Sequence, residues 1–194
     1  MEKLTRDDLL SLEQYSNKRM EFRQRALAHK RDRNLAIGPN VTLLFEDRLT
    51  IQYQIQEMLR VERIFESAGI QDELDAYNPL IPDGRNWKAT MLIEFPDVAE
   101  RRQALARLID IERKIWVQVN GCERVTAIAD EDLERGTPEK TSAVHFLRFD
   151  LDEAMVSALK DGASVSAGVD HPEYQHSVAP VLENIRRSLL ADLE

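Results

Sequence analysis

The fold is decided by two consecutive stretches, residues 42–66 (TLLFEDRLTIQYQIQEMLRVERIFE) and residues 67–95 (SAGIQDELDAYNPLIPDGRNWKATMLIEF). Over residues 47–67 the apolar side chains recur at a spacing close to 3.6, which predicts one long amphipathic helix. Residues 71–86 contain two prolines and an Asp-Gly pair, which predicts a polar loop. The largely apolar run 88–95 predicts a strand.

Outside these stretches, strand patterns alternate irregularly with helical ones. Further strands are predicted at residues 35–37, 41–45, 115–119, 124–129, 145–149 and 165–169. Further helices are predicted at residues 97–109 and 152–160 and from residue 180 onward. Turn residues at 38–40 and 120–121 join neighbouring strands as hairpins. The pattern therefore predicts an α+β fold, with a mostly antiparallel sheet covered by helices and an N-terminal helical arm.

Composition narrows the class of protein. The chain has 194 residues and a net charge of −9, so its surface as a whole repels nucleic acid and nucleic-acid binding is not expected. Its apolar runs are shorter than a membrane span requires, and the N-terminal MEKLTRDDLL lacks a signal-peptide pattern. The single cysteine, Cys122, fits a reducing compartment. These features predict a cytoplasmic protein without a membrane partner.

Charge is distributed unevenly along the chain. Residues 1–33 hold nine Lys/Arg and six Asp/Glu, a net charge of +3, which leaves −12 for residues 34–194. We therefore expect a basic N-terminal helical arm, residues 1–33, followed by a single α+β domain, residues 34–194. A basic segment beside an acidic body suggests self-association, so a homodimer is predicted.

One candidate surface combines the predicted long helix with the loop and strand that follow it. Its aromatic and polar side chains suit recognition of a partner or ligand: Arg60, Arg63, Tyr77, Asn78, Asp83, Arg85, Trp87 and Lys88. Two alternatives remain open. One is that the aromatic residues pin the loop to the body. The other is that the four cations Arg60, Arg63, Arg85 and Lys88 bind an anionic small molecule.

A second candidate site lies in the sequence DHPEYQH at residues 170–176. It brings together Asp170, His171, Glu173 and His176, and His145 is a more distant additional ligand. Imidazole and carboxylate groups bind divalent metals, so a small metal-dependent enzyme or sensor is one hypothesis. The alternative is a solvated connection, because Asp and His are common in turns.

The common catalytic signatures are absent from this sequence. It contains no GxxxxGK[ST], GxGxxG, GxSxG or HExxH motif, so the usual nucleotide, serine-hydrolase and metalloprotease routes lack support. The preferred interpretation is therefore a non-catalytic accessory protein that associates with itself and with a partner. No catalytic residue is assigned.

Several blocks of the chain together resemble a bacterial family known only as a domain of unknown function. The blocks are LTRDDLLSLEQY, LLFEDRLTIQYQIQEMLRVERIFE, NPLIPDGRNWKATMLIEFPD, EKTSAVHFLRFDL and GVDHPEY. Members of that family are encoded near rubrerythrin-like and iron–sulfur oxidoreductase proteins. The resemblance implies an accessory role in redox or metal metabolism, with a redox or iron–sulfur protein as partner. One cysteine is too few for this chain to hold such a cluster itself.

Overall fold

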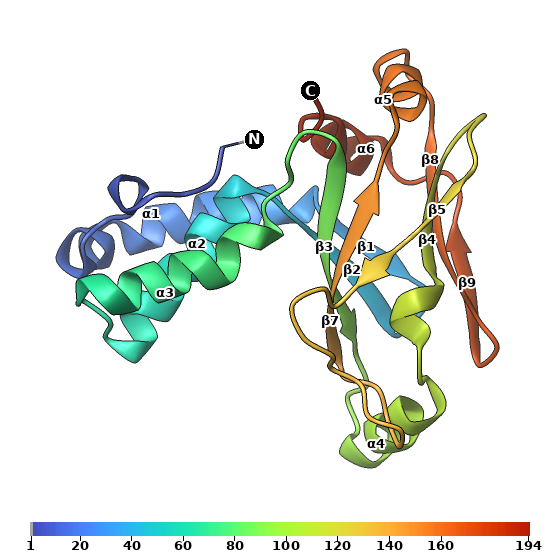
Figure 1. Ribbon diagram of the computed structural model, residues 1–194, viewed down its shortest axis with the longest axis horizontal. Helices are drawn as coiled ribbons and strands as arrows, with labels where there is room; N and C mark the ends of the chain where they lie inside the picture. The colour runs from blue at the N-terminus through green and yellow to red at the C-terminus, as the bar shows by residue number, and fades with distance from the viewer. Residues whose placement is uncertain (1) are drawn as a thin grey trace.

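The computed structural model describes residues 2–194 and shows a body of strands from which a group of helices projects (Figure 1). We call this projection the helical lobe; it consists of η1 (Arg6–Asp8), α1 (Leu12–Arg31), α2 (Arg48–Glu62), α3 (Ser67–Tyr77) and η2 (Asn78–Leu80). In the described part of the chain, no helix has both the length and the apolar composition that a bilayer crossing demands.

The body contains two antiparallel sheets. The first has the strand order β1 (Asn34–Ile37), β2 (Val41–Glu46), β3 (Asn86–Ile93), β7 (Val144–Asp150) and β6 (Ile128–Ala129). The second has the order β5 (Arg124–Thr126), β4 (Ile115–Val119), β8 (Val165–His171) and β9 (Tyr174–Val178). The other elements of the body are α4 (Val98–Arg107), η3 (Ile111–Lys114), α5 (Glu153–Lys160) and α6 (Glu183–Leu190).

The main hydrophobic core lies between the two sheets. Along β2 the side chains alternate between buried and half-buried, so Val41, Leu43 and Phe45 all point inward. Val117 on β4 and Ala167 on β8 belong to the same buried cluster. The predicted α+β class, with antiparallel pairing and an N-terminal helix, is confirmed. The strands form two facing sheets instead of one. Strands from both halves of the chain have one apolar side, and the two apolar sides bury each other.

The prediction of one long helix over residues 47–67 followed by a loop is wrong in detail. The helix α2 ends at Glu62 because Arg63 takes a left-handed conformation with φ 57°, and a separate helix, α3, occupies the first part of the expected loop. Asp72 and Asp75 made this segment look like a loop, but they lie on the exposed side of α3. Leu74 on its other side is buried, and this packing favours the helix.

The helical lobe has its own apolar cluster, separate from the core between the sheets. Residues Leu4, Ile51, Ile55, Leu59, Leu74 and Ile81 form it. The N-terminal segment is attached to the lobe through the fully buried Gln56 of α2. Its amide oxygen accepts from the Leu10 nitrogen at 2.7 Å, and its amide nitrogen donates to the Leu10 carbonyl at 3.2 Å.

Replacing Gln56 by leucine is expected to lower the free energy of unfolding by about 1–3 kcal/mol, because both polar groups of the Leu10 backbone lose their partner. Urea denaturation followed by circular dichroism measures the change. Gln54→Leu on the same helix is the control, since the half-buried Gln54 makes no side-chain hydrogen bond in the described structure. Equal losses in the two variants would show that the Leu10 contact contributes nothing specific.

Candidate functional site

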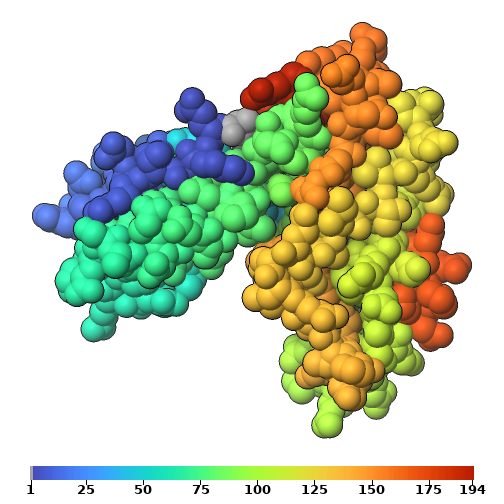
Figure 2. Space-filling view, in the orientation of Figure 1, coloured from blue at the N-terminus to red at the C-terminus, as the bar shows by residue number. Residues whose placement is uncertain are grey.

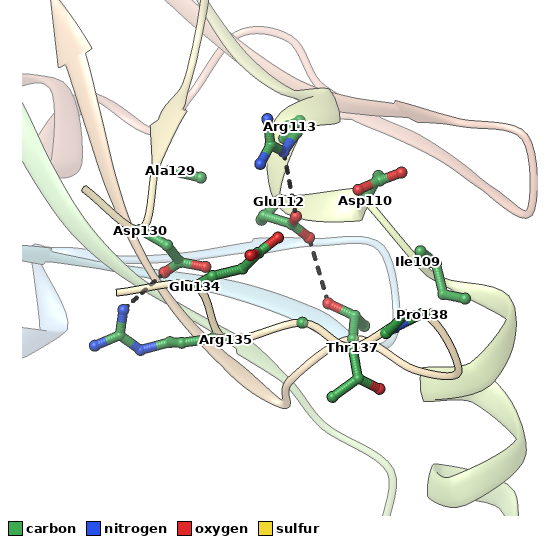
Figure 3. Close-up of a pocket in the computed structure, with 12 residues that line it drawn as sticks. Ile109, Asp110, Glu112, Arg113, Ala129, Asp130, Glu134, Arg135, Thr137 and Pro138 are labelled. Atoms are coloured by element: carbon green, nitrogen blue, oxygen red, sulfur yellow. Dashed lines mark hydrogen bonds and ion pairs between the residues drawn. The ribbon is translucent and has the colours of Figure 1, made fainter. Parts of the chain in front are cut away.

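A cavity of about 600 Å³ opens beside η3, at the end of β6 and the loop of residues 130–141. We call it the Glu112 pocket and define it by Asp110, Glu112, Asp130, Glu134, Arg135 and Thr141, which all line it. In Figure 3 these side chains come from separate segments: Glu112 from η3, and Asp130, Glu134 and Arg135 from the loop opposite. The pocket is therefore assembled by the tertiary fold.

A buried imidazole lies behind this pocket. His145 is fully buried on β7, because the alternation of that strand places it on the inward side with Leu147 and Phe149. Its Nδ1 is 2.5 Å from Asp130 Oδ2, and its Nε2 is 2.8 Å from the hydroxyl of Thr141. The Thr141 hydroxyl in turn donates to Glu112 Oε2 at 3.3 Å. These contacts form a continuous series of polar contacts that runs from Asp130 through His145 and Thr141 to Glu112.

The oxygen atoms around His145 indicate where its protons lie. Nδ1 faces the Asp130 carboxylate, while Nε2 lies 3.1 Å from the Ser142 carbonyl and 3.8 Å from Glu112 Oε2. Carbonyl and carboxylate oxygens only accept hydrogen bonds, so both ring nitrogens are placed to donate. The imidazole therefore lies between two carboxylates, with Thr141 as a hydroxyl bridge on one side.

Asp130 is fixed by several contacts at once. Its Oδ1 accepts from the Phe146 backbone nitrogen at 3.0 Å and from Arg135 at 3.1 Å, while Oδ2 holds the imidazole. Its backbone has φ 51°, and Asp110 across the pocket has φ 65°. Left-handed backbone at a residue other than glycine is uncommon and persists where surrounding contacts impose it. Two such residues therefore flank this pocket.

The pocket carries more negative than positive charge. Arg135 is engaged by Asp130 and by Asp132, and its contact with Asp132 lowers the pKa of that carboxyl to about 2. Asp110 and Glu134 are exposed and form no ion pair within residues 2–194. The lining therefore presents carboxylates without matching cations.

The similarity of this chain to known proteins extends over nearly its whole length. Residues 3–193 match the family model described as a protein of unknown function, DUF3501. The chain belongs to the DUF3501 family. A crystal structure from Burkholderia pseudomallei K96243, described as a novel protein of unknown function, is 53% identical and covers 100% of both chains with a TM-score of 0.95. The comparison with curated proteins gives no match.

In this DUF3501 protein the residues predicted as metal ligands have separate surroundings. The sequence DHPEYQH forms the end of β8, a turn and the start of β9, instead of a loop. His171 Nε2 lies 3.0 Å from the Ile109 carbonyl, and its Nδ1 accepts from the Glu173 backbone nitrogen at 3.1 Å. Asp170 pairs with Arg124, and the His176 ring lies against the Tyr174 ring at an interplanar angle of 58°. Among residues 2–194, no three His, Cys, Asp or Glu side chains are grouped to hold a metal.

The residues predicted to bind a partner or ligand do not form one continuous surface either. Trp87 is fully buried, and its indole nitrogen donates to the Leu189 carbonyl at 3.0 Å. Asn78 holds the Leu4 backbone, and Tyr77 packs against the apolar cluster of the lobe. These residues are therefore parts of the framework.

The charged members of that set lie in different elements. Asp83 accepts from the Asn86 side chain within a turn, and Arg85 forms an exposed 3.7 Å pair with Glu153. Arg60 pairs with Glu57 along α2, while Arg63 is the left-handed residue that ends this helix. Burial lowers the pKa of Lys88, which lies on β3. No common anion site is formed by these side chains.

The sequence indicates His145 as a candidate site residue, but it does not reveal the side chains that bond to His145 in the folded protein. Asp130, Thr141 and Glu112 come from a loop and a short helix whose paths the sequence does not fix. One signal was available: alternation in residues 145–149 places His145 on the same side as Leu147 and Phe149. A histidine on an apolar face requires buried polar partners, and the nearby Asp130 and Thr141 were candidates.

Proposed function

We propose that this DUF3501 protein is a non-catalytic accessory protein that self-associates through its helical lobe. The outer sides of α1 and α3, which lie on opposite sides of the lobe, support this proposal. The helix α2 packs against both α1 and α3, so the outer sides of α1 and α3 remain available. Figure 2 shows the lobe standing away from the body of strands, which leaves room for a second molecule.

The two outer helices of the lobe have opposite net charge, although Arg19 of α1 faces inward and pairs with Glu57 of α2. Helix α1 carries Lys18, Arg19, Arg23, Arg25, Lys30 and Arg31 against Glu13 and Glu21. Helix α3 carries Asp72, Glu73 and Asp75 and no basic residue. Burial, together with Glu62 and Asp72, raises the pKa of Glu73, and its Oε2 is buried without a hydrogen-bond partner. Among residues 2–194, no cation forms an ion pair with Asp72, Glu73 or Asp75 of α3.

Both sides also expose large apolar residues. Met20 (77% exposed) and Leu27 (40% exposed) lie two turns apart on one stripe of α1. Val61 (62% exposed) and Phe65 (72% exposed) lie where α2 gives way to α3. Apolar side chains beside complementary charge are typical of association surfaces. The observation that carries the proposal is this pairing of a basic, apolar side with an acidic, apolar side.

The occupant that fits is a second copy of the chain. In a two-fold dimer, α1 of one copy can lie against α3 of its partner, and symmetry repeats the contact. The redox or iron–sulfur partner expected from the family resemblance stays a prediction. The metal-dependent alternative is not carried further, because the candidate ligands have separate surroundings in residues 2–194.

Charge-reversal substitutions on α1 and α3 test the proposed dimer. Sedimentation velocity of the full chain over a wide range of concentration is expected to show dimers that weaken as salt is raised. Arg23→Glu with Arg31→Glu on α1 should give monomers, and Asp72→Lys with Asp75→Lys on α3 should do the same. Combining all four changes should restore the dimer, because the charges are again complementary.

The matched control is Arg102→Glu with Arg107→Glu on α4, which changes the net charge equally at exposed positions outside the lobe. These variants should dimerise like the wild type. A wild-type protein that remains monomeric at every concentration would refute the proposal. A dimer that ignores both pairs of substitutions would place the interface elsewhere.

A further inference from the structure

We infer that the Glu112 pocket is an acid–base site that binds a small nitrogen base and protonates it. Glu112 is the group that contacts the ligand, and His145 supplies the proton through the hydroxyl of Thr141. This inference goes beyond the proposed function and is independent of self-association, because the pocket lies in the body and the proposed interface lies on the lobe.

The buried chain provides a route for a proton. His145 Nε2 lies 2.8 Å from the Thr141 oxygen, and that oxygen lies 3.3 Å from Glu112 Oε2. A hydroxyl accepts one hydrogen bond while donating another, so it can pass a proton between two groups that do not touch. Direct transfer is unfavourable here, since Nε2 and Glu112 Oε2 are 3.8 Å apart. Thr141 is therefore a positioning residue, and Glu112 is the residue that contacts the ligand.

The proton balance closes without any further reactant. In the proposed step His145 carries a proton on each ring nitrogen, because both nitrogens face acceptor oxygens. Its Nε2 proton moves to Thr141 as the Thr141 hydroxyl proton moves to Glu112, and Glu112 passes that proton to the lone pair of the ligand nitrogen. The products are a neutral imidazole, an ionised Glu112 and a cationic ligand. The cation then lies against a carboxylate, which stabilises it.

The charge and shape of the pocket favour a nitrogen base. Glu112 is only 8% exposed and accepts one hydrogen bond from Thr141, while the Arg113 guanidinium is 3.7 Å away and largely exposed. A carboxylate accepts several hydrogen bonds, so acceptor capacity remains on the pocket side. Figure 3 shows the side chains of Glu112 and Glu134 extending into the same space. Ile109 and Pro138 add apolar lining for the carbon part of a ligand.

A purely structural role explains this network less completely. Asp130 and the Ser142 carbonyl already satisfy both nitrogens of His145. Burying Glu112 beside them costs free energy, which the Thr141 hydroxyl at 3.3 Å and the largely exposed Arg113 at 3.7 Å offset only in part. A ligand that becomes cationic in the pocket adds to that compensation.

Imidazole and pyrazole are the probes that test the inference on the full chain. The two rings have the same size, but only imidazole is readily protonated near neutral pH. Imidazole is expected to bind saturably to the wild type at slightly alkaline pH, and pyrazole at least about tenfold more weakly. Calorimetry in phosphate and in Tris, which differ in heat of ionisation, reports whether protons are exchanged with buffer. NMR of the ¹⁵N-labelled His145 ring reports whether its Nε2 proton leaves.

Three variants separate the roles of the residues. Glu112→Gln should lower the affinity for imidazole at least about tenfold. The double variant Asp110→Asn with Glu134→Gln should also lower this affinity, without disturbing the fold, because both side chains are exposed. Thr141→Val should leave imidazole bound but remove the change in the His145 ring signals. The control Glu153→Gln changes a carboxylate at a different cavity and should leave binding unchanged.

Three results would overturn the inference: no saturable binding of imidazole, equal affinity for imidazole and pyrazole, or an unchanged His145 response in Thr141→Val. A monomeric protein that binds imidazole as described would contradict the proposed function alone. A dimer without imidazole binding would contradict this inference alone.

Discussion

Replacing Arg33 by methionine is expected to lower the free energy of unfolding by about 3–5 kcal/mol. The Arg33 guanidinium is 2% exposed and joins the end of α1 to the body. It donates to the Phe45 carbonyl at 2.9 Å and to the Ser188 carbonyl at 3.2 Å, and it pairs with Asp192. The substitution keeps the volume but leaves the buried Asp192 without its cation. Chemical denaturation at neutral pH measures the loss.

The loss caused by Arg33→Met should also depend on pH. Burial raises the pKa of Asp192 to about 6, against the opposing effect of Arg33. A carboxyl whose pKa is higher in the folded state favours folding when protonated, so its contribution falls as pH rises from about 4 through 6. Without Arg33 the pKa of Asp192 rises further, and the difference from the wild type should be larger at pH 8 than at pH 5. An equal loss at both values would mean that Asp192 does not sense Arg33.

Replacing His145 by leucine is expected to cost about 3–5 kcal/mol of unfolding free energy. The imidazole is fully buried, and its removal leaves Asp130 and Thr141 without the partner that joins them. Leucine fills similar space, so the loss arises from polar groups that become unpaired. Thermal unfolding of the full chain provides the measurement.

The matched control for this prediction is His176→Leu. His176 is exposed on β9, where its ring lies against Tyr174 and close to Gly38, so its replacement should cost about 1 kcal/mol or less. If both histidines gave the same small loss, the buried chain from Asp130 to Glu112 would not be a stabilising network. The pocket assignment would then lose its structural basis.

Local sequence patterns predicted much of the secondary structure. The strand predicted at residues 41–45 appears as β2, because alternating Val41, Leu43 and Phe45 bury one side. The helix predicted at residues 97–109 appears as α4, with Asp97 accepting from the Glu100 nitrogen at its start. Such signals depend on residues close in sequence, and local hydrogen bonds and periodic burial are enough to fix them.

Prediction failed where distant residues determine the outcome. The break after Glu62 depends on a left-handed Arg63 that lets α3 fold back on α2, and the helical pattern continues across that point. Trp87 looked like a binding residue beside a polar loop, yet it packs in the core with Phe45 and bonds to α6. A tryptophan in a strand has no local feature that distinguishes these two settings.

By itself the sequence determined the α+β class, the antiparallel hairpins, the family and a charge difference between the N-terminal segment and the rest of the chain. These properties follow from composition, periodicity and recognisable sequence blocks, all of which are visible without the three-dimensional structure. Only the tertiary structure decided that α1 and α3 lie on two sides of α2, and that His145 meets Asp130, Thr141 and Glu112. The contacts of His145 reach back to Glu112, 33 residues earlier, and Tyr15 of α1 bonds to Glu57 of α2, 42 residues later. Their geometry is set by how the two sheets and the helical lobe pack, and a sequence pattern of short range does not contain it.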